Sequence, residues 1–293
     1  MIEEKIKAFA ASFEDKISRI FEKNRKEYEI VAEAMKYSLS DGGKRLRPFL
    51  VEEFYRLCGG NGDSAKNFQL AIECIHTYSL IHDDLPCMDD DDMRRGKPSC
   101  HKKFGEANAL LAGDALLTYA FEIASNAEGI PAERIVKAMK LLAYYAGIDG
   151  MIGGQTVDLI SESKKDIDIG MVKLICSLKT GALLKASCLI GCTLAGADDQ
   201  QLRAAEEYAE NVGVAFQIMD DILDITGDEK KLGKPLHSDT DNEKSTFVSL
   251  LGIERCKAEV KLLTEWAKSA LSIFGQDAKD LEELADYLCN RDY

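Results

Sequence analysis

The chain has 293 residues, 46% of them hydrophobic, and a formal net charge of −14 from 37 Lys plus Arg against 51 Asp plus Glu. This size allows a sizeable buried core, in one large domain or two average ones. The acidic excess excludes nucleic acid as the main partner, because binding to a phosphate backbone requires a basic face. An anionic ligand must therefore be held locally, by a basic pocket or by metal ions.

Helical periodicity dominates from the first residues onward. Ile6, Phe9, Phe13, Ile17 and Ile20 recur at steps of three and four, which predicts an amphipathic helix. Similar patterns follow at residues 64–81, 107–125, 132–147 and 254–274, whereas alternating strand patterns are absent. The five prolines mostly mark joints between helical blocks. The sequence predicts an all-α protein, with a single domain of about ten or more helices over residues 1–293.

Neither the N-terminus nor the longest apolar run predicts a membrane segment. The first 16 residues are acidic and amphipathic, unlike a signal peptide. The apolar run at 171–197 is interrupted by Lys173, Lys179 and Lys185, so we expect no membrane insertion. The nine cysteines are scattered without a metal-ligand cluster, which predicts reduced thiols in a cytoplasmic protein.

The stretch SLIHDDLPCMDDDDMRRG, residues 79–96, ends an apolar helix with six aspartates. On a regular helix Asp83 and Asp89 would not share a face, since six residues rotate by about 600°. Pro86 breaks the hydrogen-bond ladder, so we expect the chain to bulge and return Asp89 toward Asp83.

A second cluster, MDDILD, follows the apolar run VGVAFQIM and places Asp220, Asp221 and Asp224 toward one helix face. Carboxylates against a buried wall need cations, although a solvated helix end is the alternative. Oxygen ligands without His or Cys favour Mg²⁺, or Mn²⁺, which completes its shell with substrate phosphate. Two such clusters about half the chain apart predict two walls of one cavity.

Two basic motifs complete the pattern. Lys44, Arg45 and Arg47 follow a Gly-Gly turn, and Arg94 and Arg95 follow the first cluster. Arginine side chains match phosphate oxygens bidentately. Two basic motifs with two aspartate motifs predict two diphosphates, one held through metal and one by direct basic contacts.

The motifs GGKRLRP, HDDLPCMDDDDMRRGKP, GGQTVDL, KTGALL and FQIMDDILD, in this order, resemble those of the trans-prenyltransferases, the short-chain isoprenyl diphosphate synthases. The likeness is closest to bacterial farnesyl diphosphate synthases and extends from about residue 30 to the end. It implies an isoprenoid synthase fold of helices around a central cavity, in a homodimer. It also implies that dimethylallyl or geranyl diphosphate ionises to an allylic carbocation, which isopentenyl diphosphate attacks.

The resemblance also implies a role for each motif residue. Mg²⁺ ions, about three with the substrate diphosphate, would bind Asp83, Asp89, Asp158, Asp220 and Asp224. Arg94, Lys179 and Lys234 would hold the allylic diphosphate, and Lys44, Arg47, His76 and Arg95 that of isopentenyl diphosphate. Dipoles of Lys179, Thr180 and Gln217 would stabilise the carbocation. Thr180 and Gly181, inside a helical run, also predict a kink, with a packing glycine as the alternative.

Product length depends on the residues just before the first aspartates. Tyr78 and Ser79, fifth and fourth before Asp83, resemble the pattern of fifteen-carbon producers and predict farnesyl diphosphate. Geranylgeranyl diphosphate is the alternative product. A terpene cyclase would not need the second basic site, and a non-catalytic synthase subunit would typically lack one aspartate motif. A plain acidic metal-binding protein would leave the arginines unexplained.

Overall fold

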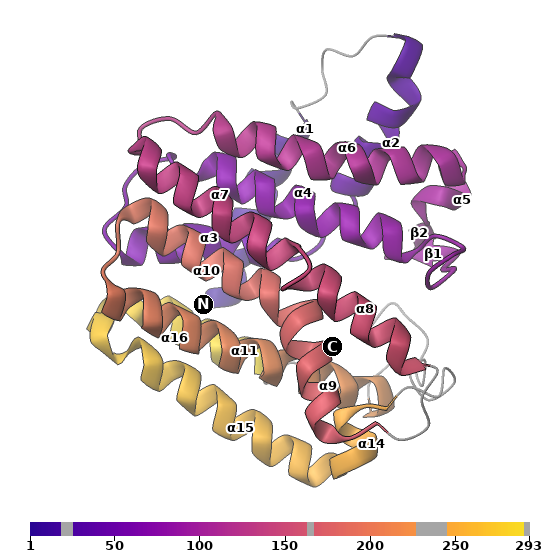
Figure 1. Cartoon of the computed structure of the whole chain (residues 1–293). Helices are drawn as coiled ribbons and strands as arrows, with labels where there is room; N and C mark the ends of the chain where they lie inside the picture. Colours follow the sequence, from indigo (N-terminus) through magenta and orange to yellow (C-terminus); the bar gives the residue numbers. More distant parts are fainter. Residues whose placement is uncertain (19–25, 163–166, 227–244, 290–293) are drawn as a thin grey trace.

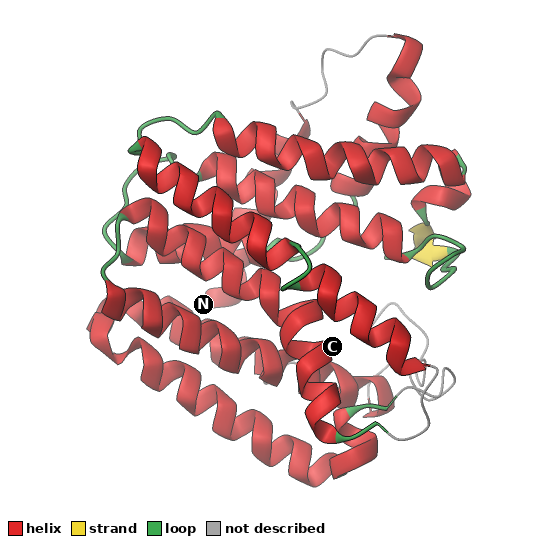
Figure 2. Cartoon of the chain, in the orientation of Figure 1, coloured by secondary structure: helices red, strands yellow, loops and turns green. Residues whose placement is uncertain are grey.

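The computed structural model describes residues 1–18, 26–162, 167–226 and 245–289, which are almost entirely helical (Figure 1, Figure 2). The first half comprises α1 (Ile2–Ser18), η1 (Lys26–Tyr28), α2 (Glu29–Leu39), α3 (Leu46–Leu57), α4 (Lys66–Asp83), β1 (Met93–Arg94), β2 (Lys97–Pro98), α5 (Cys100–Phe104), α6 (Glu106–Ser125) and α7 (Ala132–Ala146). The second half comprises α8 (Met151–Glu162), α9 (Ile169–Ile175), η2 (Cys176–Gly181), α10 (Ala182–Ala195), α11 (Asp199–Thr226), α14 (Phe247–Leu251), α15 (Ile253–Ala270), η3 (Leu271–Ala278) and α16 (Lys279–Cys289). The all-α prediction is confirmed.

One small β-hairpin was not predicted. Strands β1 and β2 pair antiparallel, with Met93 opposite Pro98, and form the yellow element in Figure 2. Arg95 (φ 50°) and Gly96 (φ 78°) connect them in left-handed conformations, as two-residue hairpin turns require. Two residues per strand are too few to produce an alternating pattern in the sequence.

Helix α10 is the central helix of the bundle and packs against α3, α7 and α11 (Figure 1). Its side chains enter both hydrophobic clusters of the core. Leu183 and Ile190 belong to the cluster that includes α4 and α6, whereas Leu184 and Cys188 belong to the cluster that includes α11 and α15. A helix that is apolar all round is expected to be buried on all sides.

The segment Ile169–Ala195, which joins α9, η2 and α10, is long and apolar enough by length and composition to cross a membrane. However, 61% of its apolar window is buried inside the protein, as in a core helix. Burial in the protein core accounts for the apolar composition of this segment.

The distortion predicted at Thr180 and Gly181 is a π-helical turn. This turn, η2, spans Cys176–Gly181 and continues directly into α10. Single π turns inside α-helices occur frequently at functional sites.

Candidate active site

The first aspartate cluster begins where α4 ends, at Asp83. The backbone N–H of Asp89 donates to the carbonyl oxygen of Asp83 at 2.9 Å, so the chain returns after Pro86 as predicted. Burial raises the pKa of Asp83 to about 6, Lys179 opposes this rise and Asp89 adds to it. A buried carboxylate with a raised pKa suits a nearby cation, which would favour its charged form.

Asp84 holds the arginine that follows the cluster. It is buried, with 2% exposure, and accepts two hydrogen bonds from Nε of Arg94, at 2.7 and 2.8 Å. A third, from Nη2 of Arg94, measures 2.5 Å. This ion pair fixes the side chain of Arg94, in strand β1, against the end of α4. The sequence carried no signal for it, because the partners lie ten residues apart across a loop.

Helix α8 and the π turn η2 approach each other at backbone distance. A Cβ atom at Gly154 would lie 2.3 Å from the backbone nitrogen of Lys179, so only glycine fits there. One turn further along α8, Asp158 accepts a hydrogen bond from Nζ of Lys179 at 2.6 Å. Both side chains are partly buried. The structure thus brings two predicted site residues together as an ion pair.

The second aspartate cluster lies near the C-terminal end of α11. Asp221 and Asp224 are buried, and Asp220 is partly buried. Asp221 accepts from the backbone N–H of Phe247 at 2.8 Å and from Nε2 of Gln217 at 3.2 Å. It therefore attaches the start of α14 to α11, a positioning role that the sequence did not reveal.

The π turn is adjacent to both clusters. Its Thr180 hydroxyl donates to Oε1 of Gln217 on α11 at 3.3 Å. Burial raises the pKa of Cys176 to about 12, and the negative charges of Asp221 and Asp220 contribute to the rise. On the other side, the charge of Lys179 acts on Asp83. The two clusters thus border the same segment, as the expectation of one cavity requires.

A group of basic side chains lies beside the first cluster. Burial lowers the pKa of Arg47 to about 10, and its Nε atom is buried with no hydrogen-bond partner among the described residues. Burial, with the charges of Arg47 and Arg95, lowers the pKa of His76 well below its usual value. The Arg95 side chain is held by the carbonyl oxygen of Gly42, at 2.7 Å. A buried, unpaired guanidinium nitrogen is what an oxyanion could satisfy.

Arg45, in the middle of the motif GGKRLRP, stabilises the fold. It is 3% exposed and adopts a left-handed conformation, with φ at 48°. Its guanidinium donates to Glu73 at 2.6 Å, to Glu14 at 2.7 Å and to the Leu39 carbonyl at 2.6 Å. The three contacts hold this side chain inside the fold and join α4, α1 and α2.

Tyr78 lies inside the protein on α4, with 5% exposure. Burial raises its pKa to about 12, and the charge of Asp83 acts in the same direction. Its hydroxyl has no hydrogen-bond partner among the described residues, and its ring meets that of His82 edge-on at 5.7 Å. The ring is therefore buried within electrostatic reach of the first aspartate cluster.

Two predicted residues are not part of these contacts. Lys44 is exposed, and its ammonium lies over the ring of Tyr287 at 5.3 Å. Lys234 lies outside the described residues. For the remainder, carboxylates from α4, α8 and α11 supply only oxygen donors, which fits Mg²⁺.

Comparisons with known proteins identify the family. The sequence matches the family model for Polyprenyl synthetase over residues 28–288. It is 45% identical over 267 residues to a farnesyl diphosphate synthase of Escherichia coli (strain K12), covering 89% of both chains. It is also 45% identical over 262 residues to a geranylgeranyl diphosphate synthase of Cyanophora paradoxa, covering 89% of this chain and 87% of the relative.

Solved structures agree. A geranyltransferase from Helicobacter pylori, complexed with magnesium and isoprenyl diphosphate, superimposes with a TM-score of 0.85. Its sequence is 33% identical, and the match covers 99% of this chain and 96% of that one. The chain therefore belongs to the polyprenyl synthetase family and is a prenyltransferase of the farnesyl or geranylgeranyl diphosphate synthase type, which joins its substrates head to tail.

Proposed function

We propose that this prenyltransferase is a farnesyl diphosphate synthase, which condenses isopentenyl diphosphate with dimethylallyl and then geranyl diphosphate. The observation that carries the proposal is the buried ring of Tyr78, next to the carboxylate of Asp83. An apolar chain that grows away from the aspartates meets this ring, and a filled space stops further growth. Buried space in proteins is close-packed, so one aromatic ring decides whether extra carbons fit.

The allylic diphosphate would lie between the two aspartate clusters. Mg²⁺ would be held by Asp83 and Asp89 on one side and by Asp220 and Asp224 on the other, with Asp158 as a further ligand. When bound, the metal neutralises the diphosphate and makes it a better leaving group. The magnesium in the Helicobacter pylori relative supports this assignment, and Mn²⁺ has the same ligand preferences.

Cationic side chains complete the allylic site. Asp84 orients the guanidinium of Arg94, and Asp158 orients the ammonium of Lys179. We assign both cations, with Lys234, to the oxygens of the allylic diphosphate. Fixed charges of this kind stabilise the developing negative charge on the leaving group without reorganising during the reaction.

Isopentenyl diphosphate would bind at the basic side chains beside the first cluster. Arg47, Arg95 and His76 lie within electrostatic reach of one another, and Lys44 stands at the exposed edge. The unpaired Nε of Arg47 supports direct contact with phosphate oxygen. His76, kept neutral by burial and by the arginines, donates one hydrogen bond without adding charge.

The π turn would face the allylic carbon. Thr180 and Gln217 are connected by a hydrogen bond, so their oxygen dipoles are fixed relative to each other. A π turn also leaves backbone carbonyls without their usual helical partners. Together with the Lys179 carbonyl, they would stabilise positive charge on the allyl group while water is excluded.

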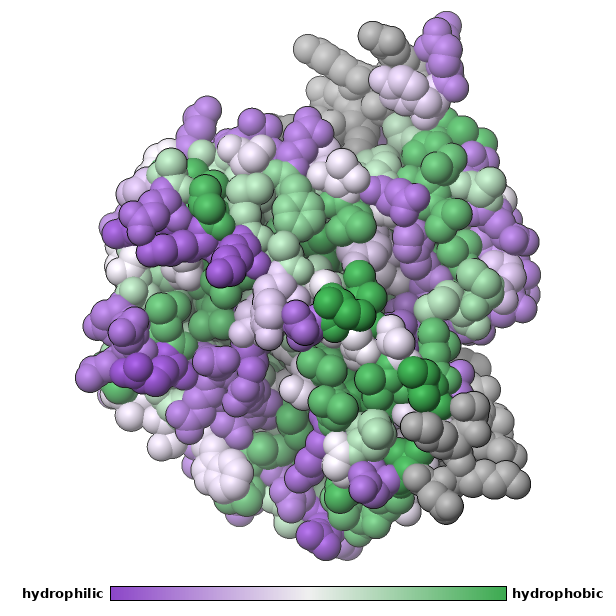
Figure 3. All heavy atoms as spheres, viewed as in Figure 1, coloured by the Kyte–Doolittle hydropathy of each residue, from purple (hydrophilic) through white to green (hydrophobic). Residues whose placement is uncertain are grey.

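Two properties of the whole protein follow from its surface and its thiols. Exposed apolar residues at the end of α7 and along α8, including Tyr144, Ile148 and Ile152, support a homodimer. Figure 3 shows apolar side chains extending across the middle of this face. None of the nine cysteines forms a disulfide, which supports the reducing cytoplasm. We regard residues 1–293 as one domain.

A product assay tests the proposal. Purified enzyme receives isopentenyl and dimethylallyl diphosphates with Mg²⁺, with and without chelator, and the products are separated by chromatography. We expect fifteen-carbon product, abolished by the chelator. Tyr78→Ala should lengthen the product, whereas Tyr78→Phe keeps the ring and should leave it unchanged. A twenty-carbon product from the unmodified enzyme would instead identify a geranylgeranyl diphosphate synthase. This is the second candidate function, because the Cyanophora paradoxa relative is named as such an enzyme.

A further inference from the structure

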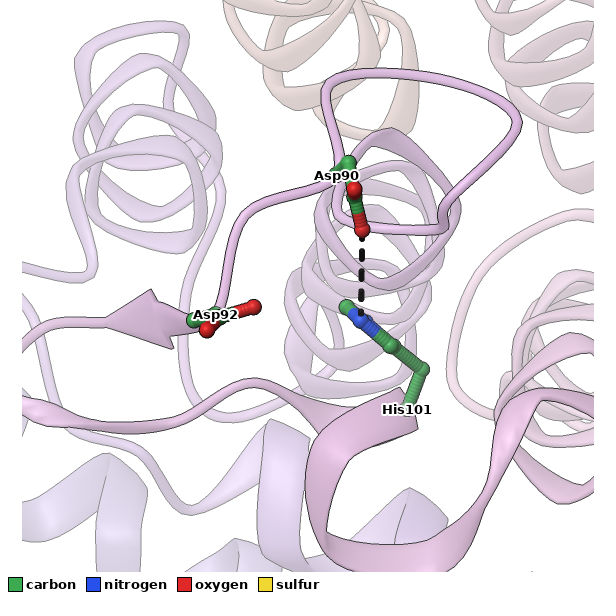
Figure 4. Close-up of side chains that lie close together, drawn as sticks. All are labelled: Asp90, Asp92 and His101. Atoms are coloured by element: carbon green, nitrogen blue, oxygen red, sulfur yellow. Dashed lines mark ion pairs between the residues drawn. The ribbon is translucent and has the colours of Figure 1, made fainter.

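A second cluster of potential ligands lies beyond the residues assigned to the diphosphates. Asp90 and Asp92 belong to the loop between α4 and β1, and His101 belongs to α5. Each offers one ligand atom, and these atoms all lie within 4.8 Å of one another. Figure 4 shows the imidazole of His101 pointing toward the Asp90 carboxylate, and their closest atoms, Nε2 and Oδ1, are 4.0 Å apart.

The histidine is arranged as a metal ligand usually is. His101 is buried, with 5% exposure, and its Nδ1 lies 3.1 Å from the hydroxyl of Ser99, which is also buried. Its Nε2 is buried and has no hydrogen-bond partner among the described residues. Metal-binding histidines generally bind a second group through the other ring nitrogen, which fixes the ring and its tautomer. The unpartnered Nε2 thus faces the carboxylates of Asp90 and Asp92, where one cation would contact all three side chains.

We propose that Asp90, Asp92 and His101 bind a divalent transition-metal ion of the zinc class. One imidazole with two carboxylates suits such an ion, whereas Mg²⁺ prefers oxygen ligands alone. Two ligands of one zinc ion are at most about 4.2 Å apart and about 3.4 Å apart in tetrahedral geometry. The observed 4.0 Å between His101 and Asp90 is thus close to a bound geometry. Small rotations of the exposed aspartates would complete it.

The backbone already holds the ligands in place. The Asp90 N–H donates to the Leu85 carbonyl at 3.2 Å, and Asp90 has a left-handed φ of 52°. The Asp92 carbonyl accepts from the N–H of Ser99 at 2.9 Å, which fixes the loop to the start of α5. Both carboxylates are exposed, at 62% and 72%, so an ion can enter from solvent.

One competing cation is present. Lys102 places its Nζ atom 2.6 Å from the Asp92 carboxylate. Lys102 is itself exposed, and exposed pairs of this kind contribute little, so a divalent ion would displace it readily. Bound metal would then connect the loop that carries Asp89 directly to α5. This binding does not depend on prenyl transfer.

Zinc titration of the full-length protein tests the proposal. Excess Mg²⁺ saturates the all-oxygen site, and Cys87→Ser, present in every variant, removes the exposed thiol in the same loop. Calorimetry should then detect one zinc ion per chain. The chain has only four histidines, so the ring signals can be followed by NMR, and that of His101 should shift with zinc.

Matched variants decide the outcome. Asp90→Asn and Asp92→Asn should each weaken zinc binding by about tenfold or more. Asp91→Asn removes the same charge between them but lies outside the cluster, and it should bind zinc like the parent protein. Asp90 and Asp92 are exposed, so their variants should fold normally. They test the metal site even if a variant of the buried histidine, His101→Gln, fails to fold. Equal zinc affinity in all three aspartate variants, or an unmoved His101 signal, would overturn the proposal.

Discussion

Lys179 of the π turn and Asp158 of α8 form an ion pair of 2.6 Å, which joins these two elements within the candidate active site. Their side chains are 27% and 18% exposed, so the pair is screened only in part by water. Its position depends on the backbone contact at Gly154, one turn earlier on α8.

Asp158→Asn should misplace the ammonium of Lys179, because the amide no longer attracts it by charge. We expect kcat/KM for the allylic substrate to fall by roughly tenfold to a hundredfold. Steady-state kinetics over a range of allylic diphosphate concentrations measures this. Asp149→Asn, an exposed change just before the same helix, is the control and should leave the kinetics unchanged. Equal kinetics in both variants would remove Asp158 from the site.

Asp84→Asn should loosen Arg94, whose guanidinium it binds through both carboxylate oxygens. Breaking a largely buried pair leaves one charge unmatched, so we expect a loss of about 2–3 kcal/mol in unfolding free energy. The KM for the allylic diphosphate should rise as well. Urea denaturation and kinetics measure the two effects. Asp91→Asn removes the exposed, 3.7 Å partner of Arg94 and should change stability very little.

His76 should stay neutral throughout the physiological pH range, since burial and the neighbouring arginines lower its pKa. The unfolded chain gains a proton on this histidine below about pH 6.5, whereas the folded protein does not. The contribution of His76 to stability is therefore present above that pH and declines as the pH falls below it. Melting temperatures from pH 8 to 5 should decline more steeply for the parent protein than for His76→Gln. An NMR titration that showed His76 protonating near pH 6.5 would contradict this.

Gly154→Ala should force α8 away from the π turn, because the added Cβ would lie 2.3 Å from backbone nitrogen. Overpacking of this kind costs about 1–3 kcal/mol. Activity should fall further than stability, since the movement separates Asp158 from Lys179. Thermal unfolding and single-turnover rates measure both effects. Thr156→Ala, an exposed change on the same helix, should be neutral in activity, and a Gly154→Ala enzyme of normal rate would refute the argument.

The sequence predicted the helices well because long apolar periodicities report which face is buried, as in α1 and α15. It also predicted the return of Asp89 to Asp83, since proline limits the local backbone in a known way. It did not predict that Asp84 holds Arg94, or that Asp221 holds Phe247. Such contacts join segments that meet only in the folded chain. The two-residue strands on either side of Arg95 were missed because they are too short to show an alternating pattern of apolar and polar residues.

The π turn at Cys176–Gly181 makes the local structure depend on the number of residues in this segment as well as on their identity. A π turn accommodates one residue more than an α-helical turn, so deleting one of its residues would restore ordinary α-helical winding while the flanking segments keep their phase. Helix α10 has apolar neighbours on two sides, so its orientation is fixed by the core. A substitution here alters one side chain, whereas a one-residue deletion would remove the widened turn that lies against α8 and α11 and leave the core-facing side of α10 in place.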